Sequence, residues 1–417
     1  MAAQLTPPGL RGRVEAPFTI LLRGTASNLV AAGVTTASLF VVAVAIARSL
    51  GSEAFGTFSV TMTAIAIAGL VADLGLDSLI TREFAPREDS PARAFSQFLR
   101  VKLVTSSALA VAAVAGTLLI PIPHRGVVVA GALYLVSRSA SSGLEHYCKA
   151  TRRRTLLVAA SFGAGLLAVG GIVVGLRLGI NVQQCIVVLG CVESLRALAL
   201  WWSVRRRAFC PDAVRIPVGH LVREGIPFAA MGIFGLILAR ADILLLALLS
   251  GPREAGLYSA ADRFLFAGNL LAFAVYGSSL PLFAGILDAG LRKKTVKHAI
   301  LAGFLVSALG SVLLSLFATY LINATFGFPE SAGLLRVLAL TLPFLIVNTI
   351  LGTALFALHQ EALVARILGI ACAVNILLNL AFIPVYGAVA SAVICVGTEA
   401  LLTLVYARIY RTTADFR

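Results

Sequence analysis

Apolar stretches of about 20 residues, the length that a transmembrane α-helix requires, follow one another along almost the whole chain. They limit the fold more than any other feature and predict an all-α integral membrane protein with about twelve transmembrane helices. We place these helices at residues 25–47, 57–76, 99–120, 126–144, 156–176, 182–203, 225–249, 258–283, 297–320, 333–357, 363–384 and 387–408. Composition agrees, because 59% of the residues are hydrophobic and only 13% are charged, whereas soluble proteins carry roughly 25% charged residues.

Basic residues are distributed unevenly among the predicted loops. The chain has 34 Lys and Arg against 19 Asp and Glu, a formal net charge of +15. Most of the Lys and Arg residues, Lys102 among them, fall in every second loop, counted from the N-terminal segment. The loops on the opposite side hold Arg48, Arg125, Arg177, Arg253 and Arg263. Because short cationic loops stay in the cytoplasm, this pattern predicts cytoplasmic N- and C-termini. It also explains the basic charge without nucleic acid, which we exclude as a partner.

An internal repeat relates two segments that lie 200 residues apart. GSEAFGTFS (51–59) aligns with GPREAGLYS (251–259), and each segment follows the first helix of a predicted six-helix half. A true repeat predicts two pseudo-symmetric six-helix lobes around a central cavity, as in many transporters; chance similarity of small turn residues is the alternative. The domains then expected are a cytoplasmic N-terminal segment (1–22), an N-lobe (23–203), a cytoplasmic linker (204–223), a C-lobe (224–410) and a cytoplasmic tail (411–417).

Motifs of common enzymes and metal sites do not occur in the sequence. The chain has no Gly-Lys dipeptide, hence no Walker A phosphate loop, and neither HExxH nor GxSxG is present. Its cysteines show no CxxC spacing and are interpreted as small buried side chains, and its histidines fall at helix ends or in loops. We therefore expect no catalytic residues, no metal and no cofactor, and we predict that the protein is not an enzyme.

Ionisable residues inside the predicted spans need a partner, water or a function, because a charge at the bilayer centre costs about 2.5–3.5 kcal/mol on insertion scales. Glu193 and Arg196 lie three residues apart in the sixth span, and we expect a structural ion pair. Arg138 lies among serines in the fourth span, with Glu145 on the same face. Arg138 either lines a wet cavity and contacts an anion or extends to the cytoplasmic interface.

Two further arginines lie close to a carboxylate in the second half of the chain. Arg240 and Asp242 are two residues apart and point to nearly opposite sides of the seventh span. Asp242 and Arg263 are about equally far from the turn near Pro252, so we expect an Asp242–Arg263 pair, either static or broken during transport, that leaves Arg240 to face the cavity. Arg138, Arg240 and Arg263 are therefore the candidate substrate-binding residues, and they favour an anionic substrate.

Deep carboxylates are candidates for coupling transport to an ion. Asp73, Asp242 and Glu399 lie within predicted spans, where carboxylates mark proton and ion pathways, so we take them as candidate coupling residues for H⁺ or Na⁺. Asn375 and Asn379 are four residues apart on one face of the eleventh span. They predict hydrogen bonds between helices, with contact to a sugar as the alternative.

Several segments resemble one transporter family. ARSLGSEAFGTFSV (47–60), ADLGLDSLITREFA (72–85), RADILLLALLSGPREAGLYSAADR (240–263) and NILLNLAFIPVYGAVASA (375–392) are similar to the polysaccharide (O-antigen, Wzx-type) flippases of the multidrug/oligosaccharidyl-lipid/polysaccharide exporter superfamily. This resemblance implies two six-helix lobes, alternating access, and a lipid-linked oligosaccharide on undecaprenyl pyrophosphate that moves from the inner to the outer leaflet. The protein would then lie in a bacterial cytoplasmic (inner) membrane and contact membrane lipids, a counter-ion (H⁺ or Na⁺) and a polysaccharide polymerase during surface polysaccharide biosynthesis.

Other functions remain open at this point. An ion-coupled multidrug or small-molecule exporter of the same superfamily would depend on the deep carboxylates rather than on the arginines. A membrane-bound polymerase or ligase would need a large outside loop, and none is predicted. A major-facilitator sugar carrier would need a GxxxDRxGRR-like loop after the second span, which LITREFAPREDSPAR (79–93) does not match.

Overall fold

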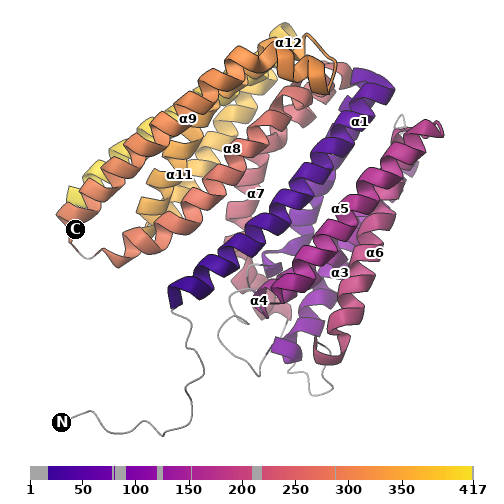
Figure 1. Cartoon of the computed structure of the whole chain (residues 1–417), viewed down its shortest axis with the longest axis horizontal. Coiled ribbons are helices and arrows are strands. Elements are labelled where there is room, and N and C mark those ends of the chain that lie inside the picture. The colour runs from indigo at the N-terminus through magenta and orange to yellow at the C-terminus, as the bar shows by residue number, and fades with distance from the viewer. Residues whose placement is uncertain are drawn as a thin grey trace, which may run out of the picture.

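The computed structural model describes residues 17–77, 79, 91–119, 125–151, 153–208, 218–286 and 288–415. Every regular element in these ranges is a helix (Figure 1): α1 (Pro17–Asp73), α3 (Pro91–Leu119), α4 (Arg125–Ala150), α5 (Arg154–Arg177), α6 (Val182–Ala208), α7 (Val218–Leu249), α8 (Pro252–Gly285), α9 (Ala289–Thr325), α10 (Ser331–Ala339), α11 (Thr341–Ala357) and α12 (Glu361–Asp415). Residues 1–16 of the predicted N-terminal segment, 209–217 of the linker and 416–417 of the tail lie outside the described ranges.

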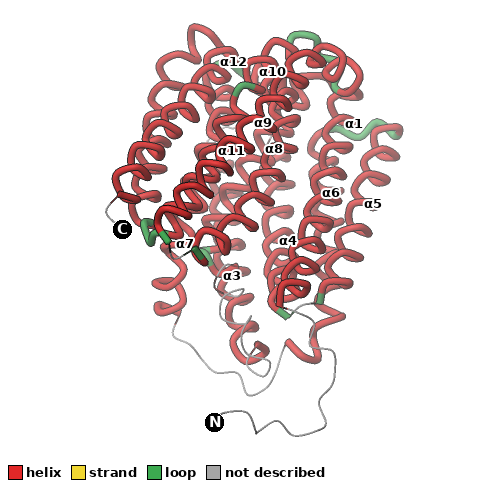
Figure 2. The backbone as a smooth tube through the Cα atoms, turned by 60° about the vertical axis from the view of Figure 1, so that its left-hand side comes forward, coloured by secondary structure: helices red, strands yellow, loops and turns green. Residues whose placement is uncertain are grey.

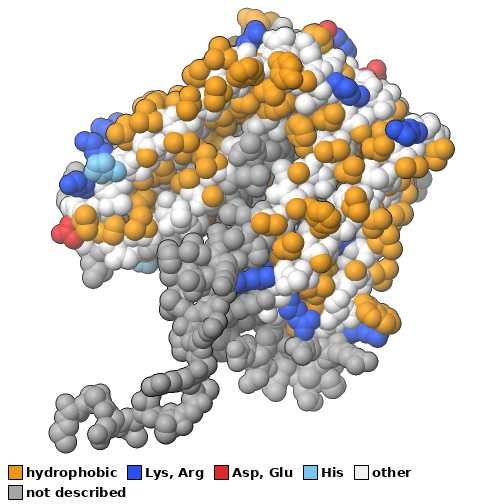
Figure 3. Space-filling model, viewed as in Figure 1, with side chains coloured by type: hydrophobic (Ala, Val, Ile, Leu, Met, Phe, Trp, Pro, Cys, Tyr) orange, Lys and Arg blue, Asp and Glu red, His pale blue; other side chains and the backbone are white. Residues whose placement is uncertain are grey.

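The described helices are those of an all-α membrane protein. Nine of them are long and apolar enough to cross a membrane, judged by length and composition. Large apolar side chains such as Leu166, Leu316 and Tyr320 are exposed on them. Figure 3 shows hydrophobic side chains over much of the face in view, with the charged side chains mostly toward the ends. Such a surface suits contact with lipid rather than water.

Two of the helices are kinked where the sequence predicted separate spans. α1 has non-helical dihedrals at Gly51 (φ 84°, ψ 177°), and α12 has them at Gly387 (φ 56°, ψ −139°). Both glycines have a positive φ that other residues adopt only with strain. The kinks divide α1 and α12 into two arms each, which correspond to the predicted spans 25–47 and 57–76, and 363–384 and 387–408.

The helices form two bundles that lie side by side (Figures 1 and 2). In the first bundle α4 packs against α6 and α3, and α1 against α5; in the second α11 packs against α8, α9 and α12, and α12 against α7. Each bundle has an apolar core of its own, one around Phe95 and Leu200 and the other around Phe283 and Leu355. A third core, which includes Phe55 and Leu246, joins the bundles.

The bundles touch where the two repeat segments meet. An added Cβ at Gly56 would lie 1.7 Å from the Pro252 carbonyl oxygen, and one at Gly256 would lie 2.1 Å from the Ser52 carbonyl oxygen. Only glycine permits this approach of backbone to backbone. Gly251 has φ 93° and ψ 168°, close to the conformation of its repeat partner Gly51. We call this end of the molecule the crossing end.

Aromatic side chains and one arginine add contacts between the bundles at the crossing end. Neighbouring rings pack with centroids 5.5–6.4 Å apart in an aromatic cluster of Phe40, Phe55, Phe264, Phe326 and Phe328. The guanidinium of Arg48 donates to the carbonyl oxygens of Thr325 (2.6 Å), Ala324 (2.8 Å) and Asn323 (3.1 Å). These carbonyls end α9, and a cation stabilises the negative end of a helix dipole.

Candidate functional site

A cavity of about 610 Å³ lies between the bundles, walled by α1, α3, α4, α7 and α8. Its volume is in the usual range for a small-molecule site. Basic side chains outnumber acidic ones in its lining, four to three if histidine is left out. The charged and titratable side chains that line it are Lys102, Arg138, Arg240, Arg263, Asp73, Asp77, Asp262 and His146. The three candidate substrate-binding arginines, predicted from separate segments of the sequence, are all in this set.

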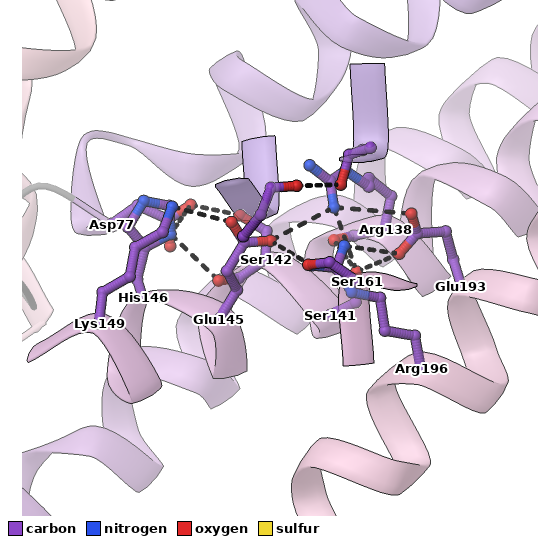
Figure 4. A network of polar contacts seen from close by, with 12 residues as sticks. Asp77, Arg138, Ser141, Ser142, Glu145, His146, Lys149, Ser161, Glu193 and Arg196 are labelled. Atoms are coloured by element: carbon purple, nitrogen blue, oxygen red, sulfur yellow. Dashed lines mark hydrogen bonds and ion pairs between the residues drawn. The ribbon is translucent and has the colours of Figure 1, made fainter. Parts of the chain in front are cut away.

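Arg138 reaches the cavity from α4, and two carboxylates hold it there (Figure 4). Its Nη1 lies 3.6 Å from Glu193 Oε1 and 3.8 Å from Glu145 Oε2, while 38% of the side chain stays exposed. These distances are long for charged hydrogen bonds, so the guanidinium keeps donors for a ligand. The structure places Arg138 in the cavity wall, which was one of the two positions expected for it. That Arg138 contacts an anion there stays a prediction.

The predicted Glu193–Arg196 pair forms, as part of a larger network that joins α4, α5 and α6. Arg196 Nη1 lies 3.8 Å from Glu193 Oε2, and Arg196 Nη2 lies 2.9 Å from Glu145 Oε2 and donates to Ser161. Lys149 Nζ lies 2.8 Å from Glu145 Oε1. Figure 4 shows how this network holds the carboxylates behind Arg138. The network therefore has a structural role, which is to hold Arg138 in position.

The expected Asp242–Arg263 pair is wrong. Asp242 instead accepts hydrogen bonds from the Tyr258 hydroxyl (2.8 Å) and from Asn379 Nδ2 (3.0 Å), and it is 2% exposed. Arg240 forms an ion pair with Asp262, a carboxylate that the sequence analysis did not single out. The distance of Asp242 from the turn did not define its partner, because the direction of Asp242 around its helix axis places it toward Asn379 of α12.

A second charged cluster lies in the cavity wall of the first bundle, and sequence reasoning found only one member. Lys102 Nζ lies 2.8 Å from Asp73 Oδ1 and 2.5 Å from Asp77 Oδ2. Ser142 donates to Asp77 Oδ2 (2.6 Å), and His146 Nδ1 lies 3.2 Å from the same oxygen. Asp73 was predicted as a deep carboxylate. Lys102 was counted with loop cations because it lies near a span boundary, yet its side chain is 3% exposed.

Glu399 and the two asparagines of α12 lie apart from the residues described as lining the cavity. Glu399 Oε2 accepts a hydrogen bond from Asn348 Nδ2 (2.7 Å) on α11. Asn375 Nδ2 donates to Thr398 Oγ1 across the kink of α12 (3.3 Å), and Asn379 donates to Asp242 on α7. The expectation of hydrogen bonds between helices is confirmed. Because Asn375 and Asn379 are 1% and 0% exposed, their amides are not open to a sugar.

Solved structures of membrane transporters share this fold of two helix bundles with a charged cavity between them. The chain is similar to an inward-facing multidrug resistance MATE-family transporter of the MOP superfamily (TM-score 0.73, 14% identity, 91% of this chain and 94% of that chain covered). It is also similar to an outward-facing MATE-family transporter (TM-score 0.62, 13% identity, 99% of each chain covered). A third match is a MOP-superfamily transporter from Pyrococcus furiosus (TM-score 0.66, 14% identity, 99% of each chain covered).

Residues 21–287 match the model of the polysaccharide biosynthesis protein family, so the chain belongs to that family. No curated protein sequence matches the chain. The resemblance seen in the sequence is thus confirmed at the level of the polysaccharide biosynthesis protein family. The protein is a multi-pass membrane protein of this family, with a fold that transporters of the MOP superfamily share.

Proposed function

We propose that the protein flips a lipid-linked oligosaccharide, joined to undecaprenyl through a pyrophosphate, from the inner to the outer leaflet by alternating access. The observation that carries this proposal is the cavity of about 610 Å³ between the bundles, with its excess of basic side chains. The family is one of polysaccharide biosynthesis proteins. A lipid-linked sugar intermediate of that biosynthesis has both an anionic linkage and a polar head that must cross the membrane.

The substrate's parts match the two environments that the protein offers. Arg138, Arg240 and Arg263 would hold the pyrophosphate and the sugar in the cavity, while the prenyl chain stays in lipid along the apolar exterior. Outward movement of an anion is favoured by an inside-negative potential, by about 2.3 kcal/mol per charge per 100 mV. The potential therefore contributes to flipping even without ATP.

The orientation and topology belong to this proposal. We infer twelve crossings, because each arm of the kinked helices α1 and α12 matches one predicted span. The N-lobe (23–203) and C-lobe (224–410) then correspond to the two bundles. The crossing end faces the outside of a bacterial cytoplasmic membrane, since the basic loops, and with them both termini, stay in the cytoplasm. A polysaccharide polymerase would receive the flipped product.

Three carboxylates within the helices are the candidates for coupling to H⁺ or Na⁺. Asp242 is held by neutral donors, Tyr258 and Asn379. Asp73 shares Lys102 with Asp77 in the wall of the cavity. Protonation of Asp73 would break its ion pair with Lys102, leave Lys102 paired with Asp77 and make the cavity wall more positive. Because Asp73 lies in that wall, it is the candidate coupling residue that would interact directly with the substrate. Glu399 is a third candidate, held by Asn348.

The alternative function is an ion-coupled multidrug or small-molecule exporter. The fold shared with MATE-family transporters and the three aspartates in the cavity favour it. For the Pyrococcus furiosus transporter, a reversed polarity of the binding pocket suggests a different function. Pocket charge is therefore the property that separates the two functions, and here the basic side chains favour an anionic substrate.

Flipping of a lipid-linked oligosaccharide in proteoliposomes tests the proposal. We expect the double variant Arg138→Ala and Arg240→Ala to lose at least about tenfold in rate, since each arginine would contribute a charged hydrogen bond of about 1.5–3 kcal/mol. Arg253→Ala is the matched control, because Arg253 is exposed and pairs with Glu330 at the crossing end. Unchanged flipping by the double variant, or export of cationic drugs with no flipping by the wild type, would contradict the proposal.

A further inference from the structure

Two serines at matched positions of the repeat share an unusual environment. Ser59 and Ser259 are each 2% exposed, and both line the cavity. In the described part of the chain, neither hydroxyl has a hydrogen-bond partner. They lie 200 residues apart in sequence, at the last position of the aligned segments GSEAFGTFS and GPREAGLYS.

Several serines in other helices satisfy their hydroxyls locally. Ser137 donates to the Leu133 carbonyl (2.9 Å) and Ser307 to the Gly303 carbonyl (2.6 Å), one turn back along the helix. This bond is the ordinary one for a helical serine in an apolar environment. A buried hydroxyl without a partner is destabilising, and it occurs here at both copies of one repeat position. A group that arrives from the cavity would satisfy both hydroxyls.

The backbone geometry brings the two serines to the same place. Gly56 and Gly256 touch across the bundle interface, and each serine follows its glycine by three residues, about 4.5 Å along a helix axis. The serines therefore lie just inside the crossing end of the cavity, one from each bundle. One turn beyond them lie Thr63 and Arg263, which also line the cavity.

We propose that the hydroxyls of Ser59 and Ser259, together with the guanidinium of Arg263, form a phosphate-binding subsite at the crossing end of the cavity. The proposal rests on the proposed function and names the site that holds its pyrophosphate. Hydroxyls donate to phosphoryl oxygens, and Arg263 supplies the positive charge. The neighbouring carboxylate, Asp262, forms an ion pair with Arg240. Its negative charge is therefore compensated and repels a bound anion less than an unpaired carboxylate would.

Because the two serines come from different bundles, a ligand bound at the subsite would restrict the movement of one bundle relative to the other. A pyrophosphate has two phosphoryl groups, and each bundle offers one serine hydroxyl to them. Bound phosphate would therefore connect the bundles next to the glycine contact, where their relative movement opens or closes the cavity. Loss of either serine weakens the connection without removing a charge.

The test compares an isoprenyl diphosphate with the matching alcohol. Geranylgeranyl diphosphate and geranylgeraniol are titrated into the purified full chain in detergent, for the wild type, Ser59→Ala, Ser259→Ala and the double variant. We expect each substitution to raise the Kd for the diphosphate about tenfold, as for the loss of one hydrogen bond to a charged group. The Kd for the alcohol should not change. Ser307→Ala, which removes a satisfied hydroxyl away from the cavity, is the control.

Thermal unfolding without ligand separates a binding role from a structural one. Because alanine removes an unsatisfied polar atom, the single variants should unfold at the wild-type temperature or above it, while Ser307→Ala should not gain stability. A diphosphate Kd that stays within twofold of the wild type would overturn the subsite. So would an equal loss of affinity for the alcohol, which would indicate a change in the shape of the cavity.

Failure of the subsite and failure of the proposed function give different results. A wild-type protein that binds the diphosphate no better than the alcohol contradicts the anionic substrate itself. Serine variants that keep diphosphate affinity but lose flipping of the complete substrate would assign the hydroxyls to the sugar, which overturns the phosphate subsite and leaves the flippase proposal in place.

Discussion

Tyr258 and Asp242 show how one hydroxyl can hold a carboxylate inside a membrane bundle. Tyr258 donates to Asp242 Oδ2 at 2.8 Å, and both residues are buried. Tyr258→Phe removes this donor and leaves the carboxylate with Asn379, so we expect a loss of about 1–3 kcal/mol in unfolding free energy. Denaturant unfolding in detergent measures it. Tyr276→Phe is the control, because Tyr276 is 38% exposed; an equal loss in both variants would contradict a specific role for the Asp242 contact.

Sequence reasoning identified which charges lie in the membrane better than it identified their partners. Arg138 and Arg240 were singled out because burying a charge is costly, and Arg263 because it is as far from the turn near Pro252 as Asp242; all three line the cavity. Partners depend on rotation about each helix axis and on packing between helices, which spacing along one helix does not define. Arg240 thus pairs with Asp262, while Asp242 faces α12.

Close contact between α1 and α8 depends on two glycines of the repeat. A Cβ at Gly256 would lie 2.1 Å from the Ser52 carbonyl oxygen, a backbone atom that cannot rotate away. We therefore expect Gly256→Ala to separate the helices and to lower the unfolding free energy by about 1–3 kcal/mol, as overpacking does. Thermal unfolding in detergent measures the change.

The matched control for Gly256 is Gly310 in the middle of α9, where an added Cβ meets nothing within 4 Å. Gly310→Ala should leave stability unchanged or raise it by up to about 1 kcal/mol, since alanine favours a helix. If Gly256→Ala is as stable as Gly310→Ala, the two bundles do not depend on the glycine contact.

The helical segments were predictable, but the backbone conformation where they join was not. The apolar stretches 25–47 and 57–76 fall on the two arms of α1, which meet at Gly51, a residue with non-helical dihedrals. The two arms of α12 meet in the same way at Gly387. A glycine in the sequence shows that a positive φ is permitted, but which glycine adopts it at a junction of two helices depends on tertiary packing.

At the scale of the whole molecule, the repeat and the alternation of charged loops were enough to predict a division into two halves. They did not predict how the halves meet. Phe40, Phe55 and Phe326 are apolar residues among many in their segments, so nothing in the sequence separates an aromatic contact between bundles from a side chain that faces lipid. Arg48 likewise reads as one loop cation, although it binds the end of α9.

Arg48 is therefore the residue through which the closure of the crossing end is best tested. Its three hydrogen bonds to the carbonyls of α9 join the bundles only while this end is closed. Arg48→Ala should destabilise the closed state by about 1 kcal/mol, less than the roughly 1.5–3 kcal/mol of a hydrogen bond to a charged group, because Arg48 is exposed to solvent. That corresponds to about a fivefold shift toward states open at the crossing end.

Spin labels on α1 and α9 near the crossing end would report the shift as a larger population of long distances. Arg177→Ala, at the end of α5, is the control, because α5 belongs to one bundle only. An unchanged distance distribution in Arg48→Ala would mean that the aromatic cluster and the glycine contact hold the crossing end without the arginine. In that case substrate release would depend on separating apolar surfaces, and it would respond little to salt. A shifted distribution would instead make opening salt-dependent, since ions screen an exposed guanidinium.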